Sequence, residues 1–508
     1  MKKLTVILAA ALLPIALLAQ SEEDAAYNLE CTSIMVGREA SGTGSVITSH
    51  TCDGVSHTWV EIVPAADHKK GEMTPIRKNF RKTAFPADTA GIKIVGQIPQ
   101  VRHTYKYVNT GYPCLNEKQL AIGETTFSGP DTLINRSSMF VIEELCRLAL
   151  ERCDNARDAI RLMGSLAEQY GYGDGGECLT VADKNEVWQF EITGSGKHST
   201  GAVWAAQRVP DDHVAMSANI TRIGRIDRSD SDNFMASDNL EEVTRAHGLW
   251  DGESEFVFWK AIKCDYAKGK NFREREFIVF SQIAPSQNFS YEDDELPFSV
   301  KPDSTVSSRR VAEILRGTYD GTPFDQCTNW HNPWVNKDIM NMINGFAPGA
   351  IEFHRTLAVA WCAYSTVIEL RRDLPDAVGG VCWYAVDNPG QSPHIPIFSG
   401  ATELPAAFGK CGHKGFDPDC VLWQFRKANK LATLNWQKTK GEFQQTLKSI
   451  EDESWQKVGE AEKQFEAATG AASKAEVLNN CTSDVHSAAA TEWGKLEKKY
   501  WEQFGRGF

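Results

Sequence analysis

Cys31 is the residue of this 508-residue chain whose type and position could support covalent chemistry. It follows a polar, acidic stretch from Gln20 to Glu30 and precedes Thr32 and Ser33. A cut between Glu30 and Cys31 would leave a free α-amine beside the thiol. The ordinary pKa of such an amine is about 7.7–8.0 and that of a thiol is about 8.5, so a proton passes between them at little cost. One residue would then supply both nucleophile and base.

A structural role for Cys31 is the competing interpretation. The chain contains 13 cysteines, and composition alone favours Cys31 as half of a disulfide. We expect Cys411 and Cys420, which lie in a glycine-rich stretch, to close a short loop. The sequence contains neither paired CxxC units nor an HExxH motif, so it predicts no zinc site and no cofactor.

The N-terminus has the pattern of an export signal. Met1-Lys2-Lys3 precedes an apolar run from Leu4 to Ala19, which predicts a signal peptide over residues 1–19 and a propeptide or linker over residues 20–30. Leu29-Glu30 before Cys31 is a poor lipobox, so a lipid anchor is the weaker interpretation. Because no later segment stays apolar for about 18 residues, we expect a soluble exported protein (periplasmic or extracellular) without a transmembrane segment.

Charge and composition narrow the classes of partner. The formal net charge is -13, which argues against nucleic acid or an anionic membrane surface, because both attract clustered Lys and Arg. Hydrophobic residues make up 42% of the chain, enough for one large core or a core with an appendage.

Regular elements must position Cys31. Cys31–Gly37 and Ser45–His50 are expected to form two strands joined by the turn Ser41–Gly44, which makes a β-hairpin. Two helical patterns lie between Ser137 and Tyr170. Further strands are expected at 178–182, 187–192, 202–205, 213–217, 381–386 and 395–398. Helices between blocks of strands, without regular βαβ alternation, indicate an α+β layered fold.

The C-terminal part changes in composition after about Trp423 and becomes rich in Lys, Glu, Gln and Ala. Apolar residues recur there at helical spacing: Phe443, Leu447, Ile450, Val458, Trp493, Leu496, Tyr500 and Phe504. We expect breaks between the helices at Thr469–Ser473 and at Asn479-Asn480. This divides the chain into a main domain over residues 31–425 and a helical region over residues 426–508. These helices could assemble a homo-oligomer or cover the core, and both alternatives stay open.

A series of dispersed motifs occurs in order between residues 31 and about 430. The series resembles the dipeptidases of peptidase family C69, which belong to the N-terminal nucleophile hydrolases, near penicillin V acylase and bile salt hydrolase. The motifs are Cys31-Thr-Ser-Ile-Met-Val-Gly37, Ala40-Ser41, Gly44-Ser45-Val46, Asp53-Gly54, Glu186-Val-Trp188, Phe190-Glu191, Trp204-Ala-Ala-Gln-Arg-Val-Pro-Asp211, Ser217-Ala-Asn-Ile-Thr-Arg-Ile-Gly224, Tyr319-Asp-Gly-Thr-Pro-Phe-Asp325, Leu374-Pro-Asp-Ala-Val-Gly-Gly380 and Gly400-Ala-Thr-Glu-Leu-Pro405.

The resemblance implies a four-layer αββα fold and a secreted cysteine dipeptidase. Cys31 would be the mature N-terminal nucleophile, forming a thioester acyl-enzyme with the substrate. Asp53 would hold the α-amine, or recognise the amine of a dipeptide, and Asn219 would bind the amine or the tetrahedral intermediate. Without the resemblance, Asp53 is an ordinary turn residue before Gly54 and Asn219 a strand-end residue.

At the expected substrate-binding positions, this chain differs from the related acylases. Related acylases carry an Arg at the position of His50, and an Asn where this chain has Glu124-Thr-Thr-Phe127. Thr125 or Thr126 could donate a hydrogen bond there, and Glu124 is a candidate for binding the substrate amine. Arg225 is a candidate for an electrostatic contact in the substrate-binding site, and it could equally be an ordinary surface residue.

Two other functions stay open at this point. An amide hydrolase acting on N-acyl amino acids would belong to the acylase branch, and an apolar slot near the nucleophile would favour it. A non-catalytic exported envelope protein could use the same scaffold, with Cys31 tied in a disulfide or lipid.

Overall fold

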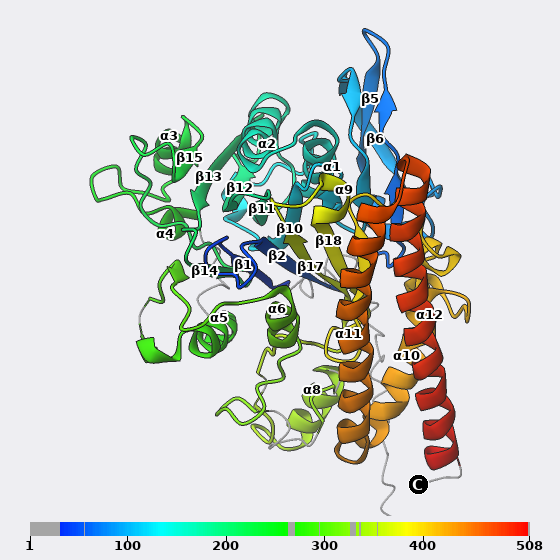
Figure 1. Ribbon diagram of the computed structural model, residues 1–508. Helices are drawn as coiled ribbons and strands as arrows, with labels where there is room; N and C mark the ends of the chain where they lie inside the picture. Colours follow the sequence, from blue (N-terminus) through cyan, green and yellow to red (C-terminus); the bar gives the residue numbers. More distant parts are fainter. Residues whose placement is uncertain are drawn as a thin grey trace, which may run out of the picture.

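Two antiparallel sheets face each other at the centre of the molecule (Figure 1). The structure is a computed structural model, and it describes residues 31–505 apart from 55, 263–269, 294, 326–331, 335–336 and 353. The hydroxyls of Thr48 and Thr180, one from each sheet, share a hydrogen bond of 2.5 Å across the interface. The interface between the sheets is therefore partly polar close to the strand that carries His50.

The first sheet has seven strands, in the order β16 (Ser299–Val300), β14 (Val214–Ser217), β1 (Ser33–Val36), β2 (Val46–Asp53), β17 (Cys362–Leu370), β18 (Gly380–Val386) and β19 (Ile395–Phe398). The second has eight, in the order β15 (Phe234–Ala236), β13 (Ala202–Arg208), β12 (Val187–Gly194), β11 (Glu177–Ala182), β10 (Ala121–Thr126), β9 (Leu115–Asn116), β8 (Tyr107–Asn109) and β3 (Glu61–Val63). Two separate ribbons pair β4 (Ala66–Asp67) with β7 (His103–Thr104) and β5 (Met73–Lys78) with β6 (Lys93–Pro99).

The predicted hairpin is confirmed, but its second strand is longer than expected. β1 and β2 pair antiparallel, with Met35 opposite Thr48. The sequence ended the second strand at His50, whereas β2 continues to Asp53 because its last residues pair with β17. All eight residues of β2 are buried, as expected for a central strand covered on both faces. Asp53 therefore ends a buried strand and does not stand in an exposed turn.

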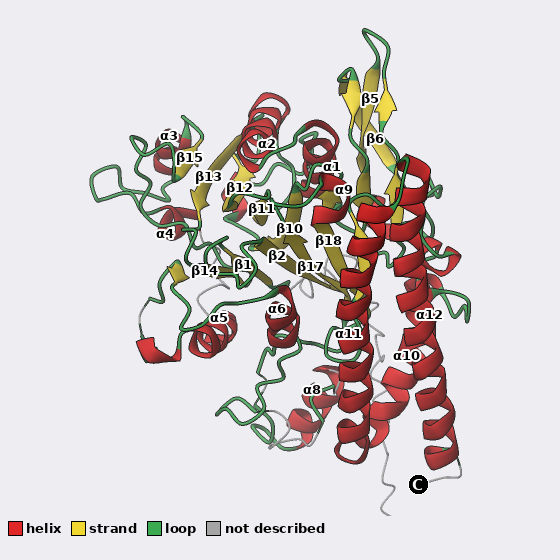
Figure 2. Cartoon of the chain, viewed as in Figure 1, coloured by secondary structure: helices red, strands yellow, loops and turns green. Residues whose placement is uncertain are grey.

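Helices cover the outer faces of both sheets, which confirms the α+β prediction (Figure 2). α1 and α2 lie on the eight-stranded sheet, while α5 and α6 lie on the seven-stranded sheet. α2 begins after Asn155, whose side chain accepts a hydrogen bond from the Asp158 backbone N–H, and it buries Ala159, Ile160 and Met163 on one face. The described helices are α1 (Ile142–Arg152), α2 (Ala156–Tyr170), α3 (Leu240–Ala246), α4 (Phe258–Ile262), α5 (Lys270–Ile283), α6 (Ser308–Leu315), α8 (Lys337–Phe346), α9 (Asp376–Gly379), α10 (Val421–Ala432), α11 (Trp436–Ala467) and α12 (Ala471–Phe504).

The two longest helices, α11 and α12, run side by side along the seven-stranded sheet (Figure 1). The predicted helical repeats are confirmed, since seven of those eight apolar residues are buried and Phe504 packs partly buried against the same core. The indole rings of Trp383 in β18 and Trp455 in α11 stack at 3.9 Å. The C-terminal helices therefore complete a layer of the molecule.

One of the two predicted helix breaks is wrong. The chain leaves α11 after Ala467 and enters α12 at Ala471, close to the predicted break at 469–473. Asn479 and Asn480 instead lie inside α12. The Asn479 carboxamide oxygen accepts hydrogen bonds from the backbone N–H groups of Thr402 and Glu403, at 2.9 and 3.3 Å. A tertiary contact thus uses the polar side chain that the sequence suggested would end the helix.

Cys411 and Cys420 are free thiols, so the expected loop-closing disulfide is not formed. The Cys420 thiol donates a hydrogen bond to the Lys410 carbonyl oxygen at 3.2 Å. All the cysteines within the described ranges are free and buried.

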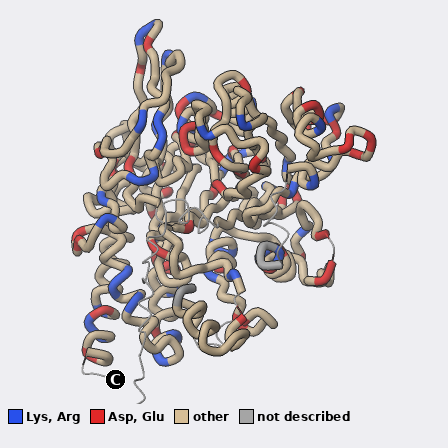
Figure 3. Tube along the Cα trace, turned by 180° about the vertical axis from the view of Figure 1, so that it is seen from behind, with Lys and Arg blue, Asp and Glu red and all other residues tan. Residues whose placement is uncertain are grey.

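Basic and acidic residues are mixed along the long helices and over the sheet layers (Figure 3). Pairs such as Lys448–Asp452, with 2.8 Å between Nζ and Oδ2, lie one helical turn apart on exposed faces. Among the described helices, none has the length and apolar character needed to cross a membrane.

Candidate active site

Cys31 lies at the start of the described chain, two residues before β1, and its side chain is 1% exposed. Its carbonyl oxygen accepts a hydrogen bond of 2.7 Å from Nη1 of Arg275. Its thiol receives a hydrogen bond from the backbone N–H of Asp53, at the end of β2. Both ends of the residue are therefore fixed, by α5 on one side and by the neighbouring strand on the other.

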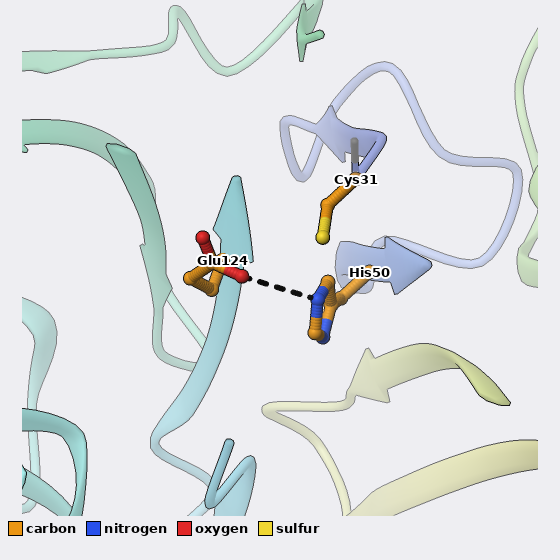
Figure 4. A group of neighbouring side chains, drawn as sticks. All are labelled: Cys31, His50 and Glu124. Atoms are coloured by element: carbon orange, nitrogen blue, oxygen red, sulfur yellow. Dashed lines mark ion pairs between the residues drawn. The ribbon is translucent and has the colours of Figure 1, made fainter. Parts of the chain in front are cut away.

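His50 and Glu124 lie beside the thiol, on strands of opposite sheets (Figure 4). The His50 Nε2 atom is 3.6 Å from the Glu124 Oε2 atom, and both side chains are almost fully buried. The Cys31 Sγ atom and one ligand-type atom of each partner all lie within 4.8 Å of one another. The structure thus brings together three residues that the sequence named for separate reasons.

Gly123 permits this close approach of the two sheets. A Cβ atom built on Gly123 would lie 2.7 Å from the Ser49 carbonyl oxygen and 2.7 Å from the Thr180 hydroxyl oxygen. Real Cβ atoms do not come so close, so β10 can reach β2 at this point only through a glycine. The neighbouring residue Glu124 is thereby placed next to His50.

The aromatic rings of Tyr112 and Tyr364 surround the imidazole of His50. Their centroids lie 5.3 and 5.8 Å from that of His50, each in an edge-to-face arrangement. Such packing fixes the orientation of the ring and excludes water around it. The Arg81 guanidinium donates a hydrogen bond of 2.6 Å to the Tyr112 hydroxyl. It therefore adds a positive charge next to the ring of Tyr112.

Burial raises the pKa of the Cys31 thiol well above its ordinary value, and the nearby Glu124, Cys52 and Asp53 raise it further. The thiol therefore keeps its proton until a base removes it. Any chemistry at Cys31 needs a proton acceptor within reach.

The carboxyl groups of Glu124 and Glu177 interact, and their pKa values shift in opposite directions. Burial raises the pKa of both, and the negative charge of Glu124 raises that of Glu177 further. For Glu124, the polar contacts with His50 and Glu177 and the charge of Arg81 outweigh burial, so its pKa is lowered. Within this pair Glu177 is therefore the carboxyl group that binds a proton more readily, and Glu124 is the one that ionises more readily.

Asn219 follows β14 in a left-handed backbone conformation, with φ of 63°. Its Nδ2 atom donates a hydrogen bond of 2.7 Å to the Thr126 carbonyl oxygen, and its Oδ1 atom accepts one of 2.9 Å from Arg275. The Thr126 hydroxyl in turn donates to Glu124 Oε1 at 2.9 Å. Asn219, Thr126 and Glu124 thus form one chain of contacts, while the neighbouring Thr125 hydroxyl bonds Ser217 at 2.5 Å.

Two buried arginines complete the site, and no pattern in the sequence indicated either of them. Arg275 also donates to the Thr32 hydroxyl at 3.0 Å and to the Ala218 carbonyl oxygen at 2.9 Å. Arg355 forms a buried ion pair with Asp53. Arg275 stands in the charged run Arg273-Glu-Arg-Glu276, a pattern typical of an exposed helix face. A fully buried guanidinium needs several partners, and only the fold shows that these exist.

Arg225 does not join this cluster. Its side chain is 74% exposed and forms an ion pair with Glu255, with 2.6 Å between Nη2 and Oε2. The surface interpretation of Arg225 therefore fits its position in the structure.

Comparison with known proteins shows the family of this chain. A family model described as peptidase family C69 matches residues 30–449. The chain belongs to peptidase family C69. Its membership identifies the protein as a peptidase, and the match begins one residue before Cys31.

Several curated relatives of this C69 peptidase carry names that state an activity. A probable dipeptidase of Latilactobacillus sakei is 25% identical over 500 residues, covering 92% of this chain and 96% of the relative. A probable dipeptidase of Salmonella dublin is 26% identical, covering 73% of this chain and 81% of the relative. Dipeptidase A of Lactobacillus helveticus is 22% identical, covering 80% and 82%.

Proposed function

We propose that this C69 peptidase is a dipeptidase whose nucleophile is the thiol of Cys31, exposed as the mature N-terminus after removal of residues 1–30. The observation that carries the proposal is the position of Cys31. It lies two residues before β1, and its buried thiol lies beside His50 and Glu124 between the two sheets. The names of the relatives and the start of the family match support the same assignment.

The α-amine of the mature Cys31 is the proposed base. It takes the thiol proton, and the thiolate attacks the carbonyl carbon of the peptide bond. The proton then passes to the nitrogen of the leaving amino acid as the C–N bond breaks, which leaves a thioester on Cys31. Water attacks the thioester and gives its proton to the amine. The first amino acid leaves as a carboxylate, and the thiol is restored.

Asn219 is the proposed donor to the oxyanion of the tetrahedral intermediate. Its amide lies in the same network as Cys31, because Arg275 binds both the Cys31 carbonyl oxygen and the Asn219 Oδ1 atom. An amide donor that contacts a developing oxyanion contributes about 3 kcal/mol to the transition state. Arg275 does not need to touch the substrate; it positions the two groups that do.

Asp53 and Glu124 are the proposed carboxylates that favour a free amino group. Asp53 is held by Arg355 at the end of β2 and lies next to the Cys31 thiol, where it can hold the α-amine. Glu124 carries a negative charge in a buried position, which favours an ammonium group over an apolar acyl chain. A dipeptide therefore fits the charge of the site better than an N-acyl amino acid.

We further propose that the protein is exported and that residues 1–19 are its signal peptide. These residues lie outside the described part of the chain, so the proposal rests on their sequence pattern.

A comparison of two cysteine variants tests the nucleophile. Cys31→Ala should lower kcat for dipeptides by at least about 10³-fold. Cys481→Ser in α12 is the matched control, since Cys481 is also a buried free thiol. Dipeptides and their N-acetyl forms should be compared on the wild type, with release of free amino acids as the readout. Full activity of Cys31→Ala would exclude the assignment, and a preference for the acetylated substrates would favour the acylase alternative.

A further inference from the structure

The Cys31, His50 and Glu124 side chains are the three common kinds of zinc ligand, a thiolate, an imidazole and a carboxylate. They come from the segment that leads into β1, from β2 and from β10, and they point toward one common space (Figure 4). Their ligand-type atoms all lie within 4.8 Å of one another. Two ligand atoms of one tetrahedral zinc ion lie about 3.5 Å apart. The His50 Nε2–Glu124 Oε2 separation of 3.6 Å already has that value.

Two of the three atoms that would bind the metal make no hydrogen bond to the described protein and face each other at 3.6 Å. His50 Nε2 and Glu124 Oε2 are buried and have no hydrogen-bonding partner among the described residues. The other carboxylate oxygen, Glu124 Oε1, is held by the Thr126 hydroxyl at 2.9 Å. Buried polar atoms are normally paired, and metal ligands are normally oriented by a second contact of this kind.

We propose that Cys31, His50 and Glu124 bind one Zn²⁺ ion and that the bound ion blocks the nucleophile. A thiolate and a carboxylate place two negative charges in a buried space, and a divalent cation neutralises both. The ion replaces the thiol proton, so binding releases one proton and forms a Zn–S bond. Thiolate and imidazole ligands favour zinc over magnesium or calcium.

The mature N-terminus supplies a fourth ligand. The α-amine and the thiol of one cysteine close a five-membered ring around a metal ion, which completes a tetrahedral site with His50 and Glu124. This step rests on the proposed function, because it needs the cut before Cys31. The same ion would occupy both the nucleophile and its base, so the dipeptidase would be fully inhibited when zinc is bound.

Metal binding is tested on the mature full-length protein with Co²⁺ and Zn²⁺ salts. Co²⁺ should give a thiolate-to-cobalt charge-transfer band, and calorimetry with Zn²⁺ should give one site per chain. Cys31→Ser should abolish the band, and His50→Gln should weaken the affinity at least about tenfold. Cys481→Ser is the control and should bind as the wild type does. A wild type without the band, or a band that survives Cys31→Ser, would overturn the site.

Activity measurements separate this site from the proposed function. Zn²⁺ should abolish dipeptide hydrolysis in proportion to site occupancy, and a chelator should restore it. If the metal-free Cys31→Ser variant keeps full activity, the nucleophile assignment fails while the metal site stands. If the wild type loses activity on alkylation of Cys31 but neither binds nor responds to Zn²⁺, the metal site fails while the nucleophile stands.

Discussion

At the scale of single residues, Arg275 is a buried charge that needs several hydrogen-bond acceptors. It is fully buried and donates four described hydrogen bonds, to the Cys31 and Ala218 carbonyl oxygens, the Thr32 hydroxyl and the Asn219 carboxamide. Its planar guanidinium serves these acceptors from fixed directions. The nucleophile and the proposed oxyanion donor are therefore linked through one side chain.

Arg275→Lys should lower kcat on the order of 10²-fold, with a smaller change in KM, because lysine keeps the charge but cannot reach all four acceptors. Steady-state kinetics on a dipeptide and the rate of Cys31 alkylation would measure the effect. Arg225→Lys is the matched control, since Arg225 is 74% exposed and outside the cluster. Unchanged kcat in Arg275→Lys would mean that the position of Cys31 does not depend on this contact.

At the scale of elements, the site depends on how closely β2 and β10 approach. A Cβ atom at Gly123 would lie 2.7 Å from the Ser49 carbonyl oxygen, a backbone atom that cannot move without shifting its strand. The site therefore depends on a residue that has no side chain and takes no part in the chemistry.

Gly123→Ala should destabilise the protein by about 1–3 kcal/mol, because the added methyl group overpacks the interface between the sheets. It should also lower activity, since His50 and Glu124 would be displaced. Gly459→Ala in α11 is the control: nothing lies within 4 Å of its Cβ position, and helix propensity makes it neutral or stabilising. Denaturant unfolding checks both variants, and equal stability of the two would contradict this account of the interface.

Glu191, which lies in β12, makes the stability of the protein depend on pH. Burial raises its pKa from the ordinary 4.5 to about 7, against the hydrogen bonds from the Arg222 backbone N–H and from Gln189, which lower it. The folded protein then binds a proton that the unfolded chain has already released. The stability contributed by Glu191 is therefore full below about pH 4.5 and is lost as the pH rises to about 7.

Glu191→Gln should remove this pH dependence, because glutamine resembles the protonated carboxyl group. As the pH is raised from 4.5 to 7, the unfolding free energy of the wild type should fall relative to that of Glu191→Gln by about 3 kcal/mol. Urea unfolding at several pH values measures it, with Glu453→Gln on α11 as an exposed control. Parallel curves for Glu191→Gln and the wild type would contradict the shift.

At the scale of the whole molecule, α11 and α12 belong to the core. Besides the Trp383–Trp455 stack, the Thr482 hydroxyl in α12 donates to the Pro396 carbonyl oxygen of β19 at 2.7 Å. Removing both helices would expose the apolar face of β18 and β19 to water.

A chain that ends after α10 should therefore aggregate or unfold, and circular dichroism and size-exclusion chromatography would show it. A stable, active truncated protein would mean that α11 and α12 form a separate appendage.

Local patterns in the sequence were enough to predict several elements of the fold. Alternation and helical spacing indicated the β1–β2 hairpin, the helices α1 and α2 and the buried faces of α11 and α12. Family-like motifs named Cys31, His50 and Glu124, which the fold brings together.

The sequence could not predict contacts that depend on distant pairing. Arg275 and Arg355 look like ordinary charged residues until α5 and the chain before β17 bring them to Cys31 and Asp53. The extension of β2 to Asp53 depends on β17, more than 300 residues later in the chain. The metal ligands have no short motif, because each comes from a separate strand region.

The most direct test of the central claim is the intact mass of the active enzyme before and after inactivation by iodoacetamide. We predict a chain that begins at Cys31, gains one carbamidomethyl group on that residue and loses dipeptidase activity in proportion to the label. A fully active chain that still carries residues before Cys31, or inactivation with the label on another cysteine, would contradict the account.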